Sequence, residues 1–226
     1  MRPDTASASL FCKTNLVKMS QERKVEKMNS YVPFLTRRFY LALQFASELH
    51  YQEHRKGTAI PYVAHLLSVC ALVLEAGGDE DQAIAALLHD AVEDHGGFST
   101  LSTIRELFGT RVADALEFRA DSTASDPVKK EDWHGRREKY LEHLRNANGD
   151  ALFVAAADKL HNARAMLSDA REMGDQSWSR FKAPKEDQLW LYDAIIEILR
   201  HRAAPKTLVD ELSRVVTELR DLEMEG

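Results

Sequence analysis

Four ionisable side chains follow an apolar stretch of this sequence closely enough to do chemistry together. His89 and Asp90 come directly after six apolar residues, 83–88, and Glu93 and Asp94 follow within about one helical turn. On a helix, residues four positions apart share a face, so His89 lies beside Glu93 and Asp90 beside Asp94 in one polar stripe. Charged residues usually face water, and a solvated stripe with a salt bridge is the ordinary interpretation of a single His-Asp pair.

Two further residues favour a buried site over a solvated stripe. His65 lies within the apolar segment 63–67, and Asp158 follows three alanines, 155–157. Taken alone, His65 is typical of a core histidine with a satisfied hydrogen bond. Asp158 lies too far inside its expected helix to be an N-cap. Two imidazoles and two carboxylates from three helices suit a divalent transition metal such as manganese, iron or zinc.

Cysteine usage excludes two other kinds of site. Cys12 and Cys70 are the only cysteines, which is too few for a disulfide framework or a cysteine-rich structural zinc site. A reducing cytoplasm is therefore the expected location. No apolar run approaches the roughly 20 residues that span a bilayer, and the polar segment 1–29 lacks the apolar region of a secretory signal.

The elements that must position these residues are expected to be helices. Apolar residues recur at intervals of three and four, and no alternating strand pattern competes with them. The chain has 10 glycines and 6 prolines in 226 residues, which leaves long uninterrupted segments. The predicted fold class is all-α, a single bundle of roughly eight to ten helices.

Capping and breaking residues predict where the first helices begin and end. A first helix is expected over residues 34–49, and Pro61 can begin a second within its first turn, which glycines 77–78 then end. Asp79 is predicted to cap a third helix that continues through Asp94. The buried faces of the first two helices are predicted to contain Phe39, Leu43, Ala46, Leu49, Val63, Leu66, Leu67, Cys70 and Leu74.

The second half of the chain has a similar helical pattern after one polar interruption. Ser99 or Thr100 is predicted to cap a short helix that Gly109 ends. Residues 121–132 have no apolar period and are expected to form an exposed loop, whereas Asp150 is predicted to cap the helix that contains Asp158. Further helices are expected to begin near residue 111 and to span residues 133–144, 188–202 and 206–222.

Charge and composition limit the partners of this protein. Lys and Arg number 30 against 36 Asp and Glu, so the net charge of −6 argues against binding to nucleic acid or to an anionic membrane surface. Hydrophobic residues at 44% and charged residues at 29% are typical of a soluble globular protein. A substrate rich in phosphate would need local clusters of cations.

The order of His65, His89-Asp90 and Asp158 resembles the HD superfamily of metal-dependent phosphohydrolases. The segments 61–65 (PYVAH), 86–94 (ALLHDAVED) and 157–162 (ADKLHN) narrow the resemblance to the RelA/SpoT-type (p)ppGpp hydrolase branch, in the form of a small alarmone hydrolase. The resemblance covers residues 35–200. It implies a nucleotide substrate and no synthetase domain.

The resemblance implies a reaction and a role for each motif residue. The reaction is removal of the 3′-diphosphate from a purine alarmone, giving GDP or GTP, or ADP or ATP, with pyrophosphate. Glu93 and Asp94 would orient or deprotonate the attacking water. The metal, usually Mn²⁺ although another divalent transition ion is possible, would be held by His65, His89, Asp90 and Asp158.

The substrate contacts that the resemblance implies come from several parts of the chain. Arg55 and Lys56 match a basic pair that meets base and phosphate, and Lys129 with Arg136 forms a second basic cluster, for which a solvated charge run is an equally good interpretation. Asn162 resembles a nucleoside contact, and Tyr192 belongs to an aromatic cluster. The implied substrate residues are Arg55, Lys56, Lys129, Arg136, Asn162 and Tyr192.

The domain boundaries predicted from these patterns are an N-terminal extension (1–30), a phosphohydrolase domain (31–203) and a C-terminal amphipathic helix packed on that domain (204–226). Several alternatives stay open on the sequence alone. They include the preference for a guanosine or an adenosine alarmone, the identity of the metal, the oligomeric state and the role of residues 1–30. Two other functions also stay open: an HD phosphohydrolase for another nucleotide, and an inactive alarmone-binding module.

Overall fold

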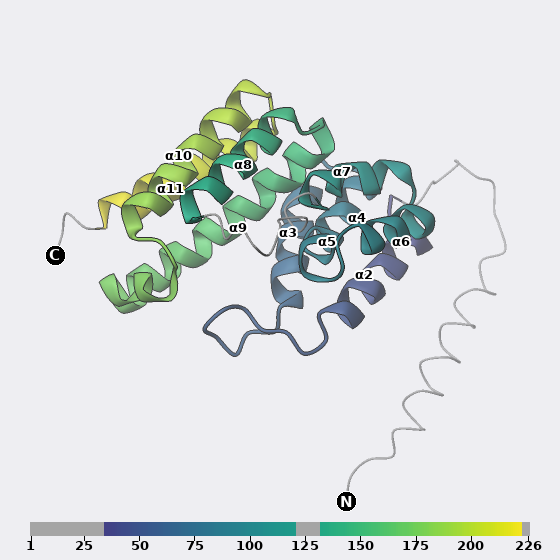
Figure 1. Ribbon diagram of the computed structural model, residues 1–226, viewed down its shortest axis with the longest axis horizontal. Coiled ribbons are helices and arrows are strands. Elements are labelled where there is room, and N and C mark those ends of the chain that lie inside the picture. The colour runs from purple at the N-terminus through teal and green to yellow at the C-terminus, as the bar shows by residue number, and fades with distance from the viewer. Residues whose placement is uncertain (1–33, 121–131, 223–226) are drawn as a thin grey trace, which may run out of the picture. The chain divides into compact units, whose positions relative to one another are not determined.

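The computed structural model describes residues 34–120 and 132–222, and these residues form an all-α bundle (Figure 1). The described part contains ten α-helices, one of them a single turn, and one 3₁₀ helix. Its only β-type pairing is an isolated bridge between His54 and Pro61. The predicted fold class is confirmed. The predicted extension 1–30 and nearly all of the loop predicted over 121–132 lie outside the described residues.

The helices fall into two groups, and one long helix of the second group packs against both. The first group is α2 (Arg37–Leu49), α3 (Val63–Glu75), α4 (Glu80–Leu88), α5 (Ala91–Asp94), α6 (Phe98–Phe108) and α7 (Thr110–Ala120). The second is α8 (Trp133–Asn146), α9 (Gly149–Met173), η1 (Gly174–Arg180), α10 (Lys185–His201) and α11 (Lys206–Asp221). Helix α9 packs against α3, α4 and α7 of the first group and against α10 and α11 of the second.

Helix α3 positions His65 on a buried face. It begins at Val63, directly after Pro61 and Tyr62, close to the predicted start. Side chains three and four residues apart bury one face of the helix, and His65 belongs to this face with 1% of its surface exposed. The prediction that Leu67 is buried is wrong, because its side chain lies on the opposite face and is 44% exposed.

Helix α4 is capped as predicted but ends earlier than predicted. Asp79 accepts a hydrogen bond from the backbone N–H of Gln82, and the Gln82 side chain accepts one from the backbone N–H of Asp79, which completes a capping box. The helix ends at Leu88, and α5 begins only at Ala91. The expected continuous helix through Asp94 is therefore wrong: it is interrupted at the two residues expected to do chemistry.

Two predicted N-caps are also wrong. Asn148, not Asp150, caps α9, because its Oδ1 accepts from the backbone N–H of Ala151. Gly97, with φ of 56°, precedes α6 in place of Ser99 or Thr100. The cap position requires a non-helical backbone just before the first turn, and several nearby polar residues can satisfy a sequence pattern for it. Gly109 does end α6, with φ of 94°.

Helix α11 covers the outer side of α9. Its apolar residues lie on one face and pack against α9 and α10. Ion pairs from Arg164 to Glu211 and from Arg171 to Glu218 also connect α9 to α11. No helix in the described ranges combines the length and the apolar character needed to cross a membrane. The buried residues of α11 are Leu208, Val209, Leu212, Val215, Val216 and Leu219.

Candidate metal centre and active site

Three helical segments bring four predicted ligands together. His65 comes from the first turn of α3, His89 from the end of α4, and Asp158 from the middle of α9. The Nε2 atoms of His65 and His89 lie 3.2 Å apart, and they lie 3.4 and 3.6 Å from Asp158 Oδ1. Asp90 Oδ2 lies 3.0 Å from His89 Nε2 and 3.5 Å from His65 Nε2.

Burial makes this cluster a strong candidate for a cation site. All four residues are in the buried class, with exposures between 0% and 9%. Two carboxylates removed from water are costly unless a proton or a cation compensates them. Two imidazole nitrogens and a carboxylate oxygen, from His65, His89 and Asp158, lie within 4.8 Å of one another and could hold a metal ion. This nitrogen and oxygen donor set fits a divalent transition metal.

Hydrogen bonds outside the cluster orient both imidazoles toward its centre. The Nδ1 of His89 lies 2.8 Å from the carbonyl oxygen of Ala86, which can only accept, so Nδ1 donates and the neutral ring presents a lone pair at Nε2. The Nδ1 of His65 lies 2.8 Å from Nδ1 of His161. Partners of this kind fix the tautomer of histidine ligands at metal sites.

The ionisation of the cluster follows from its paired charges. Burial lowers the pKa of His89, but Asp90 and Asp158 together raise it to about 9. Burial raises the pKa of Asp158, but Lys159 and hydrogen bonds from His65 and His89 hold it well below its usual range. Protons and divalent cations compete for an anionic site of this kind.

His161 and Tyr62 are two residues of the site that the sequence analysis did not single out. Burial, together with the charges of His65 and Arg55, lowers the pKa of His161 to about 4, so its imidazole is neutral. The hydroxyl of Tyr62 donates a hydrogen bond to Asp90 Oδ2 at 2.7 Å. His161 is three residues after Asp158 on α9, and this spacing was the available signal for it.

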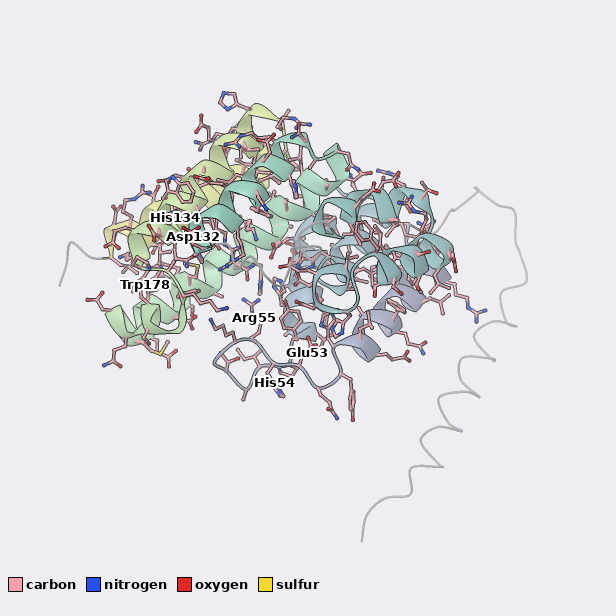
Figure 2. The ribbon with its side chains drawn as sticks, viewed as in Figure 1. Glu53, His54, Arg55, Asp132, His134 and Trp178 are labelled. Carbon is pink, nitrogen blue, oxygen red and sulfur yellow. The ribbon has the colours of Figure 1, made fainter. Side chains whose placement is uncertain are left out.

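Arg55 and Asn162 extend the site from the metal ligands toward the surface. Arg55 Nη2 donates to Asn162 Oδ1 at 2.9 Å, and Asn162 Nδ2 donates to Asp158 Oδ1 at 2.6 Å. Arg55 lies on the loop between α2 and α3, whose ends pair through Arg55 N to Ile60 O and Tyr62 N to Glu53 O, both at 2.8 Å. Figure 2 shows Arg55 on the side of this loop that faces the helices.

The remaining predicted substrate residues have different surroundings. Tyr192 is buried on α10, and burial raises its pKa. Lys56 is exposed on the same loop as Arg55. Arg136 is exposed on α8, a helix that packs chiefly against α10. Lys129 lies outside the described residues.

The two predicted catalytic carboxylates lie on α5, which begins directly after Asp90. Glu93 and Asp94 are both exposed, in contrast to the buried ligands before them. Partial burial raises the pKa of Asp94, and the negative charges of Asp90 and Glu93 raise it further. Asp94 is therefore a stronger base than an isolated carboxylate, while water still has access to it.

Comparison with known proteins identifies a matching family and several relatives. The HD domain family, HD_4, matches residues 42–180. A guanosine-3′,5′-bis(diphosphate) 3′-pyrophosphohydrolase of Aquifex aeolicus is 39% identical over 104 residues, 46% of this chain and 14% of that protein. A probable enzyme of the same name from Synechocystis is 33% identical over 55% of this chain and 16% of its own length. This chain thus spans about one seventh of the length of these relatives.

Two solved structures resemble this fold over most of their own length. A metazoan orthologue of SpoT, described as hydrolysing ppGpp, is 26% identical, with a TM-score of 0.64, over 85% of this chain and 99% of its own. The protein lmo0812 of Listeria monocytogenes is 28% identical, with a TM-score of 0.56, over 72% of this chain and 99% of its own. The chain belongs to the HD domain family and is related to the ppGpp hydrolase domains of SpoT and Rel proteins.

Proposed function

We propose that this protein is a metal-dependent pyrophosphohydrolase that removes the 3′-diphosphate from a purine alarmone, (p)ppGpp or (p)ppApp. The products are GDP or GTP, or ADP or ATP, together with pyrophosphate. The observation that carries the proposal is the convergence of four buried side chains, those of His65, His89, Asp90 and Asp158, close to Arg55, which bonds to Asn162. The proposed resident ion is Mn²⁺.

The relatives support this reaction from two directions. The Aquifex protein bears the name of the 3′-pyrophosphohydrolase and is 39% identical to this chain over 104 residues. The metazoan SpoT orthologue hydrolyses ppGpp and matches this fold over nearly its whole length.

The side chains of the centre supply the positioning and the proton transfers. A bound divalent cation lowers the pKa of a water molecule and polarises a phosphoryl oxygen. Glu93 and Asp94 accept a proton from the water as its oxygen attacks the 3′-phosphorus. The bond from that phosphorus to the 3′-oxygen breaks, the 3′-oxygen takes up a proton, and pyrophosphate leaves.

The cations on the loop between α2 and α3 suit an anionic nucleotide. Arg55 offers a planar guanidinium that can stack on a purine or pair with phosphate, and its hydrogen bond to Asn162 holds it next to the centre. Lys56 adds a mobile point charge to the same loop. We also propose Lys129, Arg136 and Tyr192 as contacts of the nucleotide.

Product analysis on three substrates tests the proposal. The purified chain is stripped of metal, reloaded with Mn²⁺ and given ppGpp, ppApp and NADPH separately, and the phosphate products are identified by ³¹P NMR. We expect pyrophosphate from at least one alarmone and no reaction with NADPH. Hydrolysis of NADPH alone would indicate a phosphohydrolase for another nucleotide, and no product from any substrate would contradict the proposed activity.

A further inference from the structure

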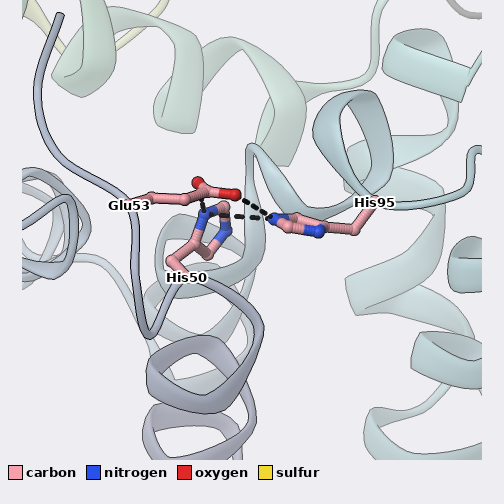
Figure 3. A group of neighbouring side chains, drawn as sticks. All are labelled: His50, Glu53 and His95. Atoms are coloured by element: carbon pink, nitrogen blue, oxygen red, sulfur yellow. Dashed lines mark hydrogen bonds and ion pairs between the residues drawn. The ribbon is translucent and has the colours of Figure 1, made fainter.

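A second group of metal-ligating side chains lies outside the centre described above. His50 follows the last turn of α2, Glu53 lies on the loop after it, and His95 follows the last turn of α5. His50 Nδ1 is 2.7 Å from Glu53 Oε2, His95 Nε2 is 3.0 Å from Glu53 Oε1, and the two nitrogens are 3.4 Å apart. Figure 3 shows the two rings and the carboxylate turned toward one another. We call these three residues the His50 cluster.

The donor atoms of the His50 cluster are spaced as the ligands of one small cation are. Ligands at about 2.1 Å from a tetrahedral ion lie about 3.4 Å apart. Two imidazole nitrogens and one carboxylate oxygen make up the protein ligand set of open zinc sites and of several iron sites. The cluster meets the same distance criterion as His65, His89 and Asp158.

The burial of His50 distinguishes the His50 cluster from a chance surface contact. The side chain of His50 has no exposed surface, and its Nε2 has no hydrogen-bond partner among the described residues. The side chains of Glu53 and His95 are 38% and 24% exposed, so a cation held here would stay accessible to solvent on one side.

The backbone brings the three side chains together from two separate segments of the chain. The loop after α2 is extended near Glu53, so the side chains of Glu53 and Arg55 lie on one side and that of His54 lies on the other (Figure 2). His95 is followed by Gly96 and Gly97, both with positive φ, which allows the chain to turn sharply into α6.

The side chain of Tyr62 connects the His50 cluster to the first metal centre. The ring of Tyr62 stacks on His50, with centroids 5.0 Å apart and an interplanar angle of 21°. The hydroxyl of the same tyrosine donates to Asp90 Oδ2. A cation held by the cluster would therefore tie the loop that bears Arg55 to the end of α5, the helix that bears Glu93 and Asp94.

We propose that His50, Glu53 and His95 bind a second divalent transition metal, separate from the centre formed by His65, His89, Asp90 and Asp158. The ligand chemistry favours Zn²⁺ or a similar borderline ion, held by three protein ligands. This inference does not depend on the proposed hydrolysis, because it concerns the number of ions bound and where they bind.

Metal stoichiometry tests the second site without an activity assay. The chain, free of any histidine tag, is stripped with a chelator, dialysed against Zn²⁺ and analysed by mass spectrometry for bound metal. We expect two ions in the unaltered chain, one in Glu53→Gln and one in His95→Ala. The control His54→Ala, which removes an exposed imidazole from the same loop, should retain two ions.

A second variant assigns each ion to its site and guards against misfolding. Asp158→Asn should remove the ion of the first centre only, and the double variant Asp158→Asn with His95→Ala should bind none. With Co²⁺ in place of Zn²⁺, Asp158→Asn should keep visible d–d absorption bands that the double variant lacks. One ion in the unaltered chain, or two ions in folded His95→Ala as judged by circular dichroism, would overturn the proposal.

Discussion

Hydrogen bonds beyond the ligands determine which ring nitrogens face the metal centre. His89 is oriented by the carbonyl group of Ala86, and His65 by His161, so both present Nε2 to the same point. Tyr62 holds one oxygen of Asp90 in the same way. These bonds restrict the orientation of the donor groups, which reduces the entropic cost of binding a cation.

The carboxylates on α5 should affect turnover without affecting metal content. Replacing Glu93 or Asp94 by its amide removes a proton acceptor, and general base catalysis typically contributes about 10²–10⁴-fold to the rate. We expect kcat for alarmone hydrolysis to fall by that order in Glu93→Gln or Asp94→Asn, with bound Mn²⁺ unchanged. The control Glu106→Gln, an exposed glutamate on α6, should keep its kcat. Full turnover in both α5 variants would contradict this assignment.

Arg55 should affect substrate binding more than turnover. Arg55→Lys retains the positive charge but loses the planar group that donates to Asn162. A hydrogen bond to a charged group contributes about 1.5–3 kcal/mol, so KM should rise about tenfold or more. Steady-state kinetics should show an unchanged KM for Arg37→Ala, which removes an exposed arginine from α2. A drop in kcat at constant KM would assign Arg55 a different role.

The sequence predicted the residues of the centre better than the partners that hold them. His65, His89, Asp90 and Asp158 stand out because ionisable groups in apolar segments need compensation. The bond between His65 and His161 joins residues 96 positions apart, and Arg55 to Asn162 spans 107 positions. Such pairs depend on how α3 and α9 pack, which a single sequence does not specify.

At the scale of elements, an ion-pair network connects three helices of the bundle. Arg111 on α7 bonds to Asp150 on α9 and to Asp79, which caps α4. The bond from Arg111 lowers the pKa of Asp150 despite its partial burial, and Gln82 adds to the effect. A carboxylate whose pKa is lowered on folding stabilises the protein above its unfolded pKa and loses this effect as the pH falls through its folded value.

Asp150→Asn should therefore reduce stability at neutral pH but not in strong acid. Because the pair is partly exposed, the expected loss in unfolding free energy is on the order of 1 kcal/mol or less. The difference from the unaltered chain should be constant above about pH 5 and should shrink as the pH falls through the lowered pKa of Asp150. Urea unfolding across pH 2.5–7 measures it, with the exposed Asp175→Asn as the control. A difference that grew toward low pH would have the wrong sign.

Helix positions were more predictable than helix ends. Apolar periodicity located the long helices because burial of one face stabilises them. The capping box at Asp79 was also predictable, but the cap at Asn148 was assigned to Asp150 two residues later. The break between α4 and α5 was missed, because His89 and Asp90 retain helical backbone angles and only their hydrogen bonds depart from the helix.

At the scale of the whole molecule, α9 connects the metal centre to the C-terminal helices. Its inner face carries Asp158, and α11 packs along it through buried apolar side chains.

Leu212→Ala removes a fully buried side chain from the contact between α9 and α11 and should lower the unfolding free energy by about 2–5 kcal/mol. Chemical denaturation should show no comparable loss for the exposed Arg214→Ala on the same helix. At low temperature, folded Leu212→Ala should still bind its metal.

The measurement that tests the central claim most directly compares the unaltered chain with Asp158→Asn for two quantities in one sample, bound Mn²⁺ and pyrophosphate released from an alarmone. Asp158 is buried and shares the centre with both histidine ligands. We predict that the unaltered chain binds Mn²⁺ at this centre and releases pyrophosphate. Asp158→Asn should lose the ion of this centre and the pyrophosphate release, while its circular dichroism spectrum and the activity of the exposed control Asp221→Asn are unchanged. Pyrophosphate release by Asp158→Asn at the rate of the unaltered chain would contradict the account.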